Sequence, residues 1–574
     1  MEKIRDAIEN GNFEDAEILL QKYRKKNTDY DDVTAILDAG IGEYYGDRTR
    51  VWNAVRNGLL YNCYNYELYV MLGNYYLSEN LYKSCLCYEN ALFYCDVSED
   101  RDAILQLLRQ LEDEYNVSLN RVTIVILSYN SLKFTKLCIE SIRLTTPESA
   151  REIMVVDNAS TDGSVEWLRE QRDIHLLENI DNMGFPVGCN QGIYASASET
   201  DIFLLNSDTV LTANALFWLR MGLYDKEENG MAGSVSNYAK WQVADGVKKE
   251  KNLLAFGEKT NVPMKYACEN RPSLIGFALL IKRKVIEQVG ELDERFSPGN
   301  YEDDDYSLRV LLAGYHNVLV KNSFIIHYGN ISFKNNSMDL TGISLRNRQM
   351  LNKKWGFNAE YYLSPRQELI QLIQGGEEEP LHILDIGCGC GALLGKAKSL
   401  YPRSEVYGIE IVPKVAEIAS RMGEVLCGDI EKAELPWDEG YFDYITLGDV
   451  LEHLMNPEDV LKKLRRYLKD GGHIIVSMPN LKHFSVLLPL LQRDVFPYED
   501  AGILDKTHVK LYTGTEIIKL ILRSGYEIEI INAIGTIKPD EKEEAVIDML
   551  VSLMDVPDKA SFITYQYVLR AVKK

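Results

Sequence analysis

The sequence predicts a multidomain chain in which a helical N-terminal domain precedes two α/β domains. At 574 residues the chain is too long for one core, because domains usually contain about 100–200 residues. The N-terminal part has a helical pattern, whereas apolar strands alternate with helical stretches from residue 121 and again from residue 381. We therefore expect a helical domain at 1–118, an α/β domain at 119–360, a linker at 361–380 and a second α/β domain at 381–574.

The composition is that of an ordinary globular protein and excludes some functions. The formal net charge of −23 argues against a nucleic-acid partner, which would require a basic face. The first six residues resemble no secretory signal, and no stretch approaches the ~18–20 apolar residues of a membrane-spanning helix. The ten cysteines are scattered, as expected of reduced thiols. We expect a cytoplasmic protein, and peripheral contact with the inner face of the membrane stays open.

The helical domain contains a faint repeat. Gly11, Gly46 and Asn80 each stand five residues before a small or apolar residue, and they are spaced 35 and 34 residues apart. This is the period of tetratricopeptide repeats, which the domain resembles. The alternative is a generic helical domain. Either interpretation predicts a packing or protein-binding module without catalytic residues.

Polar residues end the apolar strands of the first α/β domain. Ligands bind α/β sheets at the carboxyl ends of parallel strands, so these residues are candidates for a ligand site. A loop rich in glycine and amide side chains lies between the second and third of these strands. The candidates are Ser128, Tyr129, Asn130, Asp157, Asn158, Gly184, Asn190, Asn206, Ser207 and Asp208.

Two motifs in this domain each allow two interpretations. The acidic run 302–305 precedes the apolar residues 310–312 and fits the first turn of a helix, where the helix dipole stabilises negative charge. It equally fits a general base with supporting carboxylates. Asn206 and Asp208 form an Asn-x-Asp motif that fits a turn or a cation site for a diphosphate.

Taken together, these motifs resemble the family 2 glycosyltransferases of the GT-A fold, especially the rhamnosyltransferase-like branch. The resemblance also uses the segments 274–296 and 325–329 and covers about residues 121–357. It implies a nucleotide-sugar donor, linked through dTDP, UDP or GDP, and a glycan, lipid-linked or protein acceptor. Asp157 would contact the nucleotide base, and the other strand-end candidates would form the rest of the donor site.

The resemblance also implies a divalent cation, Mn²⁺ or Mg²⁺. Asp208 would be the last position of the family's Asp-x-Asp motif, and His327 would complete the metal shell. Asn206 stands where the family has the first aspartate, which leaves fewer negative ligands. His327 alternatively fits a satisfied core histidine in a strand.

The acidic run would then hold the catalytic base of a single displacement with inversion. Asp303 matches the base, Glu302 lies on the acceptor side, and the acceptor would also be held by Asp304 and Asp305. Arg309 is expected to pair with one of these acids. Neighbouring like charges should raise the pKa of the base, which suits proton abstraction.

The second α/β domain opens with a strand followed by a glycine-rich loop. Gly387, Gly389 and Ala392 satisfy a dinucleotide fingerprint, so the glycines alone leave the cofactor open. Glu410, at the end of the next strand, would hold ribose hydroxyls both in dinucleotide-binding proteins and in methyltransferases. Asp429 follows a third strand, where it would contact an adenine amino group in methyltransferases.

This array resembles the class I methyltransferases that bind S-adenosylmethionine, over about residues 381–574. The resemblance fits residues 526–532 and 562–572 to a terminal antiparallel strand pair. His453 and His508 are both candidates for the base, and each alternatively has only a structural role. The residues implied to bind S-adenosylmethionine are Asp385, Gly387, Cys388, Gly389, Gly391, Glu410, Ile411, Asp429, Ile430 and Gly448.

The sequence thus predicts a bifunctional enzyme of bacterial surface-glycan biosynthesis, for O-antigen, S-layer or flagellin glycan. It would transfer a sugar, such as rhamnose, and methylate a hydroxyl of the same glycan. Fusion of the two domains raises the effective concentration of one site's product at the other. One alternative is a scaffold or acceptor-binding protein with a single active enzyme domain. Another is an NAD-linked oxidoreductase in the C-terminal half.

Overall fold

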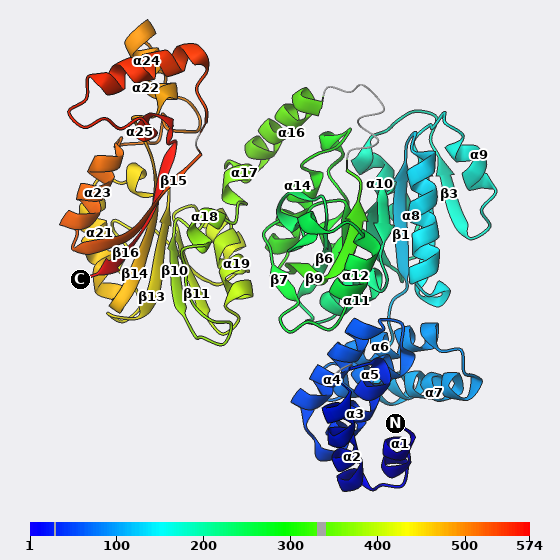
Figure 1. The fold of residues 1–574 in the computed structure, drawn as a ribbon. Coiled ribbons are helices and arrows are strands. Elements are labelled where there is room, and N and C mark those ends of the chain that lie inside the picture. The colour runs from blue at the N-terminus through cyan, green and yellow to red at the C-terminus, as the bar shows by residue number, and fades with distance from the viewer. Residues whose placement is uncertain (28–29, 330–339, 536) are drawn as a thin grey trace. The chain divides into compact units, whose positions relative to one another are not determined.

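The computed structural model describes residues 1–27, 30–329, 340–535 and 537–574. The chain forms two compact units, Met1–Phe357 and Asn358–Lys574, which are described separately (Figure 1). Among the described residues, no helix is both long enough and apolar enough to cross a lipid bilayer.

The first unit begins with helical hairpins. Gly11, Gly46 and Asn80 lie at the turns that join α1 to α2, α3 to α4 and α5 to α6, so the repeat of the sequence falls on successive hairpin turns. Asn80 also caps α6, because its side chain accepts a hydrogen bond from Lys83 N–H. The relation to tetratricopeptide repeats stays a prediction. The helices are α1 (Glu2–Glu9), α2 (Phe13–Lys26), α3 (Asp32–Tyr45), α4 (Arg48–Tyr61), α5 (Tyr66–Tyr76), α6 (Leu81–Tyr94) and α7 (Ser98–Tyr115).

These helices share a core with the α/β part of the same unit. Phe217 and Trp218 of α11 (Ala215–Leu223) are buried among apolar residues of α3 to α7. Buried Asn214, just before α11, accepts hydrogen bonds from Asn90 and Tyr94 and donates to Cys63 O. The N-terminal helices are therefore fixed to the sheet layer.

The α/β part of the first unit is built on one mixed sheet. Its strands are β1 (Val122–Ser128), β2 (Arg151–Asp157), β3 (Ile174–Glu178), β4 (Asp201–Asn206), β5 (Thr209–Leu211), β6 (Asn229–Ser236), β7 (Cys268–Asn270), β8 (Ala278–Ile281) and β9 (His316–His327). The order is β3-β2-β1-β4-β8-β6-β9-β5, and β7 also pairs with β9. Strands β3, β2, β1 and β4 are parallel. Ser128 lies opposite Asp157, and Leu127 lies opposite Asn206, so the polar strand ends meet at one edge.

Helices cover both faces of this sheet. Apolar residues of α8 (Leu132–Thr145), α9 (Ser164–Arg169) and α11 form the core of one face. The other face is covered by α10 (Phe185–Ala195), α13 (Arg283–Val289) and α14 (Glu302–Leu312). The other described elements of this unit are α12 (Leu253–Thr260), α16 (Leu340–Trp355) and the 3₁₀ helices η1 (Glu148–Ala150), η2 (Lys240–Gln242), η3 (Val247–Lys249) and η4 (Glu294–Phe296).

The second unit contains a seven-stranded sheet. Its strands are β10 (His382–Ile386), β11 (Glu405–Glu410), β12 (Glu424–Cys427), β13 (Phe442–Gly448), β14 (Leu468–Pro479), β15 (Tyr526–Ile534) and β16 (Gln566–Lys573). The order is β12-β11-β10-β13-β14-β16-β15. The first five strands are parallel, whereas β16 is antiparallel to both β14 and β15. The terminal antiparallel pair expected from the sequence is therefore present.

Helices α21 and α23 pack against one face of this sheet, and α19 packs against β11. Two short helices, α17 and α18, overlap the range predicted as a linker and form part of the second unit. The helices are α17 (Ala359–Tyr362), α18 (Gln367–Ile370), α19 (Ala392–Leu400), α20 (Pro413–Ala419), η5 (Leu451–His453), α21 (Pro457–Tyr467), α22 (Phe484–Arg493), α23 (Gly514–Arg523), α24 (Glu541–Ser552) and α25 (Ala560–Ile563).

Candidate active sites

Phe277 is the neighbour that brings three predicted site residues of the first unit together. Its carbonyl accepts a hydrogen bond from Asn206 N–H at the end of β4 (2.9 Å). Its ring stacks on the imidazole of His327, with centroids 5.0 Å apart. Gly276, the preceding residue, donates its N–H to Asp303 Oδ2 at 2.7 Å. The cation motif, the histidine and the acidic helix therefore meet at the start of β8.

Asp208 and His327 form a candidate cation site. Asp208 Oδ1 lies 3.3 Å from His327 Nε2, and both side chains are largely buried. His327 Nδ1 lies 2.8 Å from the carbonyl of Tyr238, so Nδ1 carries a hydrogen and Nε2 is the ring nitrogen that faces Asp208. This arrangement is typical of a metal-binding histidine whose other nitrogen is held by a carbonyl. Asn206 is half-buried at the neighbouring strand end.

Glu302 and Asp303 begin α14, as the sequence predicts for the acidic run. Glu302 is buried, and within the described residues its Oε2 makes no hydrogen bond. Burial, followed by the charge of Asp303, raises the pKa of Glu302 well above its usual value. Burial also raises the pKa of Asp303, although the N–H groups of Gly276 and Asp304 oppose the shift. Burial, more than the neighbouring acids, thus provides the raised pKa expected of the base.

The two remaining acids of the run have different surroundings. Asp304 is half-buried, and its Oδ1 accepts a hydrogen bond from Ser273. Asp305 is fully buried, and its oxygens contact Arg309 Nε (3.0 Å), Lys354 Nζ (2.6 Å) and Trp355 Nε1 (2.9 Å). Asp305, predicted to hold the acceptor, therefore joins α14 to α16 and does not face the site. Arg309, predicted to pair with one of the acids of the run, pairs with Asp305.

The donor-side candidates lie together at the ends of β1 and β2. Asp157 is buried, its Oδ1 accepts a hydrogen bond from Ser160 N–H, and its Oδ2 has no partner among the described residues. Asn158 N–H donates to Ser128 O, which joins the two strand ends. The side chains of Ser128 and Ser207 are buried, whereas Tyr129 and Asn130 are half-buried. Asp157 Oδ2 is thus a buried acceptor whose hydrogen-bonding capacity the described residues leave unused.

The glycine loop before α10 contacts the acidic region. Gly184 has φ +84°, and a Cβ there would lie 2.7 Å from Pro298 Cα, so only glycine fits. Phe185 N–H donates to Pro298 O at 2.9 Å. Asn190 was predicted to bind the donor. Its side chain instead bonds with the backbone of Leu292 and with Glu294, which fixes α10 to the segment before α14.

In the second unit, the predicted glycine loop lies between β10 and α19. Gly387, Gly389 and Gly391 have φ of +68°, +53° and +81°, which favour glycine. Asp385 is buried at the end of β10 and accepts a hydrogen bond from Thr446 Oγ1 (2.6 Å), and burial raises its pKa to about 7. The Cys388 thiol is buried against Gly408.

The next two strands carry the other predicted acids. Glu410 accepts hydrogen bonds from Gly389 N–H and Val412 N–H, both at 3.0 Å, and burial raises its pKa. Asp429 pairs with Lys432 Nζ at 2.8 Å, which lowers its pKa. Ile411 is 62% exposed, whereas Ile430 is buried. An exposed isoleucine beside Glu410 offers an apolar surface for a flat ring.

Two tyrosines and an arginine that the sequence did not indicate as site residues, Tyr361, Tyr362 and Arg366, also contact the predicted cofactor site. Tyr361 OH donates to Gly448 O at 3.1 Å, and Cys390 N–H donates to Tyr362 O. Arg366 Nη1 lies 3.2 Å from Asp449 Oδ2. Burial alone would lower the pKa of Arg366, but the negative charge of Asp449 opposes burial, and the pKa is raised. These tyrosines and this arginine fall in the range predicted as a linker. Their charge and aromatic character were the only signal available.

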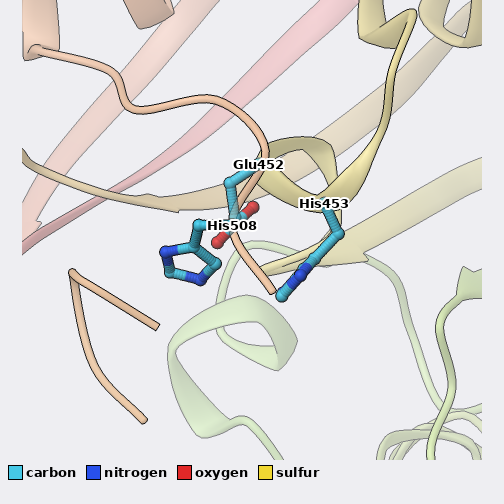
Figure 2. Close-up of side chains that lie close together, drawn as sticks. All are labelled: Glu452, His453 and His508. Atoms are coloured by element: carbon cyan, nitrogen blue, oxygen red, sulfur yellow. The ribbon is translucent and has the colours of Figure 1, made fainter. Parts of the chain in front are cut away.

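Glu452, His453 and His508 come together beside β13. Figure 2 shows the side chains of Glu452, His453 and His508 close together, and the two imidazole rings meet edge to face with centroids 4.8 Å apart. Glu452 and His453 belong to η5, and His508 comes from the loop before α23. Burial raises the pKa of Glu452 well above its usual value and lowers the pKa of His453. The two predicted base candidates are therefore neighbours.

The folds and the strand-end sites define two classes of transferase. The first sheet, with an acidic helix and an Asp–His pair at its edge, is that of a GT-A nucleotide-diphospho-sugar transferase. The second, five parallel strands and a terminal antiparallel pair with a glycine loop after β10, is that of a Rossmann-like methyltransferase. The predicted fold class is confirmed.

Comparison with known families agrees with these classes. Residues 123–290 match the model of glycosyl transferase family 2, and residues 356–530 match the model of a methyltransferase domain. The chain therefore contains a family 2 glycosyltransferase domain and a methyltransferase domain. The rhamnosyltransferase-like specificity stays a prediction.

The chain spans about half the length of the curated relatives it matches. It is 29% identical over 164 residues to an uncharacterised 37.1-kDa transposon protein of Streptomyces fradiae, which covers 27% of this chain and 46% of the relative. It is 30% identical over 122 residues to demethylmenaquinone methyltransferase of Staphylococcus aureus, which covers 20% of this chain and 51% of the relative.

Two solved structures show local similarity. One is a possible histamine N-methyltransferase of Thermotoga maritima, 22% identical, with a TM-score of 0.27 over 40% of this chain and 96% of that chain. The other is GalNAc-T7 with UDP, GalNAc and Mn²⁺, 13% identical, with a TM-score of 0.34 over 45% of this chain and 52% of that chain.

Proposed function

We propose that the chain is a bifunctional enzyme that transfers a sugar from a nucleotide donor with inversion and methylates a hydroxyl with S-adenosylmethionine. The observation that carries the first activity is the position of Phe277, which contacts Asn206 and His327 while Gly276 binds Asp303. A cation-binding pair and a carboxylate of raised pKa at one sheet edge are the parts that glycosyl transfer requires.

The side chains at this edge fit a divalent cation. Asp208 Oδ1 and His327 Nε2 both offer lone pairs and lie 3.3 Å apart, an arrangement that a cation stabilises. Asp208 and His327 would hold the ion, and Asn206 would add a neutral oxygen. The ion would supply positive charge to the diphosphate of the donor.

Asp303 would take the proton from the acceptor hydroxyl. Its Oδ2 is held by Gly276 N–H and its Oδ1 by Asp304 N–H, so the carboxylate is fixed in one orientation. Glu302, whose burial favours the protonated form, would donate a hydrogen bond to the acceptor. Asp157 Oδ2 would accept a hydrogen bond from the nucleotide base. The acceptor would thus bind at α14 and the donor at the ends of β1 and β2.

The second unit fits S-adenosylmethionine. Gly387, Gly389 and Gly391 let the backbone approach a ligand, and Glu410 keeps lone pairs for ribose hydroxyls beyond its two backbone hydrogen bonds. Asp429 would accept a hydrogen bond from the adenine amino group beside exposed Ile411. The bound molecule would supply the methyl group, and His453 or His508 would take the hydroxyl proton.

The substrates are proposals from the family resemblance. The donor would be a dTDP-, UDP- or GDP-linked sugar such as rhamnose. The acceptor would be a lipid-linked or protein-bound surface glycan, which the same chain would methylate in the cytoplasm. The N-terminal helices would bind a protein partner or the acceptor protein.

The experiment that tests glycosyl transfer measures nucleotide release from a panel of nucleotide sugars with Mn²⁺. We compare the wild type with Asp303→Asn, after subtracting hydrolysis measured without acceptor. We expect the variant to lose about 100-fold or more of acceptor-dependent release, since general bases contribute about 10²–10⁴-fold. Glu287→Gln, an exposed acid on the neighbouring α13, is the matched control and should keep full activity.

Equal acceptor-dependent release from Asp303→Asn and the wild type would refute the base assignment. Calorimetry tests ligand binding independently of turnover. A chain that binds neither nucleotide sugars nor S-adenosylmethionine would leave the scaffold interpretation, and binding of NADH in place of S-adenosylmethionine would favour an oxidoreductase.

A further inference from the structure

We propose that Glu452, His453 and His508 bind a divalent first-row transition-metal ion in the methyltransferase domain. One ligand atom from each residue lies within 4.8 Å of the ligand atoms of the other two. Ligands that bind one ion at about 2.0–2.2 Å lie at most about 4.4 Å apart, so small side-chain rotations would bring the three atoms into one coordination shell. Among the described residues, no other group of three or more histidine, cysteine or acidic side chains is so arranged.

Glu452 provides the first independent support. Its side chain is only 1% exposed, and within residues 340–535 and the other described ranges neither carboxylate oxygen makes a hydrogen bond. A buried carboxyl group without partners is costly, because it has lost its hydration and no hydrogen bond replaces it. Both oxygens lie beside the imidazoles in Figure 2. A cation between them would replace the missing interactions.

The two histidines are oriented as metal ligands. His453 Nδ1 lies 3.2 Å from Thr507 O, and His508 Nδ1 lies 2.9 Å from Ile503 O. A backbone carbonyl can only accept, so each Nδ1 carries the hydrogen and each Nε2 keeps its lone pair. This is the arrangement found for metal-ligating histidines, whose second nitrogen is held by a carbonyl or carboxylate.

The backbone holds the three side chains in this position. Glu452 O accepts hydrogen bonds from Val509 N–H (2.9 Å) and Lys510 N–H (3.1 Å), which joins η5 to the loop that carries His508. Within that loop, Asp505 Oδ1 accepts from Thr507 N–H (2.7 Å), and Asp505 O accepts from His508 N–H. The ligands are therefore brought together by main-chain contacts that do not require the ion.

The chemistry of the ligands indicates the class of ion. Imidazole suits zinc, iron, copper and nickel, whereas magnesium and calcium prefer an all-oxygen shell. Two histidines and one carboxylate are also the protein ligands of catalytic zinc sites that keep a position open. Asp449 adds no fourth ligand, since its Oδ1 accepts from Ser477 Oγ and its Oδ2 faces Arg366. The proposed ion thus retains open positions.

The site lies next to the proposed methyl donor. Val450, two residues before Glu452, reaches the glycine loop, because a Cβ on Gly387 would lie 2.8 Å from Val450 Cγ2. An acceptor hydroxyl bound at an open position would have a lowered pKa, as water does on zinc. The ion would then replace a histidine base, because the Nε2 lone pairs of His453 and His508 would both bind the ion. This last role rests on the proposed methyl transfer, whereas binding of the ion does not.

The test uses the full chain with Asp208→Asn, which removes the other candidate cation site. We dialyse this protein against Zn²⁺ and, separately, Co²⁺, and measure bound metal per chain by elemental analysis and the visible Co²⁺ spectrum. We expect one ion per chain. Adding Glu452→Gln should weaken binding by more than about 100-fold, because loss of an outer-shell partner alone costs about 10–100-fold.

The matched control is His473→Gln. His473 is a histidine of the same unit near a carboxylate, Glu529 (3.2 Å), but it lies in the middle of β14. This variant should keep the ion and the Co²⁺ spectrum. Calorimetric unfolding of the second unit shows whether each variant folds. If Glu452→Gln does not fold, His508→Gln is measured in its place.

No bound ion in the Asp208→Asn protein would overturn the proposal. Unchanged affinity in folded Glu452→Gln and His508→Gln would also overturn it. The outcome is independent of methyl transfer, because metal is measured without S-adenosylmethionine or acceptor. A chain that binds S-adenosylmethionine but no metal would retain the proposed function and lose only this site.

Discussion

His327 Nε2 faces Asp208 Oδ1 at 3.3 Å, while His327 Nδ1 is held by the carbonyl of Tyr238. Both facing atoms bear lone pairs when the imidazole is neutral. The pair therefore requires a shared proton or a cation, and the strand-end position favours a cation that meets a diphosphate.

Substitution of His327 by glutamine should reduce cation-dependent glycosyl transfer. We expect a loss of about 100-fold or more in kcat/KM, since metal stabilisation of transition-state charge is worth several kcal/mol. The measurement is nucleotide release over a series of Mn²⁺ concentrations. His175→Gln removes an exposed histidine that also lies 3.2 Å from a carboxylate, on β3, and should have no effect. An identical Mn²⁺ dependence in both variants would contradict the cation site.

Asp305→Asn should destabilise the first unit. Asp305 is fully buried and contacts Arg309, Lys354 and Trp355, so the substitution removes a buried carboxylate that pairs with two partly buried cations. Breaking a buried ion pair costs about 3–5 kcal/mol. Calorimetric unfolding of the full chain should show a lower Tm for the first unit, and the transition of the second unit is the internal control. An unchanged first transition would show that Asp305 is not a structural link.

Gly387→Ala should weaken binding of S-adenosylmethionine by about tenfold or more. The alanine would combine an unfavourable positive φ with a contact to Val450, and both effects displace the glycine loop. Gly440→Ala is the matched control, because Gly440 has φ +73° and a Cβ there would contact nothing within 4 Å. Calorimetric titration with S-adenosylmethionine measures both. Equal affinities in the two variants would mean that the contact at Val450 does not shape the site.

The stability of the second unit should depend on the titration of Asp385. Burial raises the pKa of Asp385 from 3.8 to about 7, so the folded state favours the protonated form. The stability that this protonated carboxyl group contributes is fully present below 3.8, the pKa in the unfolded chain, and is lost as pH rises through about 7. Its full size is on the order of 4 kcal/mol, at 1.36 kcal/mol for each pKa unit.

The comparison is between the wild type and Asp385→Asn. The asparagine does not titrate, so the stability of the variant relative to the wild type should rise between about pH 4 and pH 7. Unfolding of the second unit, followed at several pH values, measures this difference. If the difference in unfolding free energy between the two proteins is constant from about pH 4 to pH 7, the raised pKa of Asp385 is contradicted.

The positions of the strand ends could be predicted from the sequence. Apolar runs such as 122–127 and 202–205 stop abruptly at polar residues, and the sheet register places Ser128, Asp157 and Asn206 at one edge. The acidic run was correctly expected to begin a helix, because helix starts favour acids. Such local patterns predict the elements and the edge at which they meet.

The direction of individual side chains could not be predicted in this way. Asp304 and Asp305 are equivalent in sequence, and only packing against Trp355, 50 residues later, turns Asp305 into the core. Tyr361 and Arg366 lie in helices of four residues each or between them, which are too short to show a helical period. Asn190 looked like a ligand-binding amide because its partners Leu292 and Glu294 are distant in sequence.

The contact between Asp305 and Trp355 has a practical consequence for dissecting the enzyme. The segment that matches the glycosyltransferase family model ends at residue 290, before the acidic helix, His327 and Trp355. A shortened protein cut at that point would lack the proposed base and one cation ligand, and one cut before α16 would leave Asp305 without two of its donors. An excised glycosyltransferase would therefore have to extend through Trp355 to be a fair subject for assay or crystallisation.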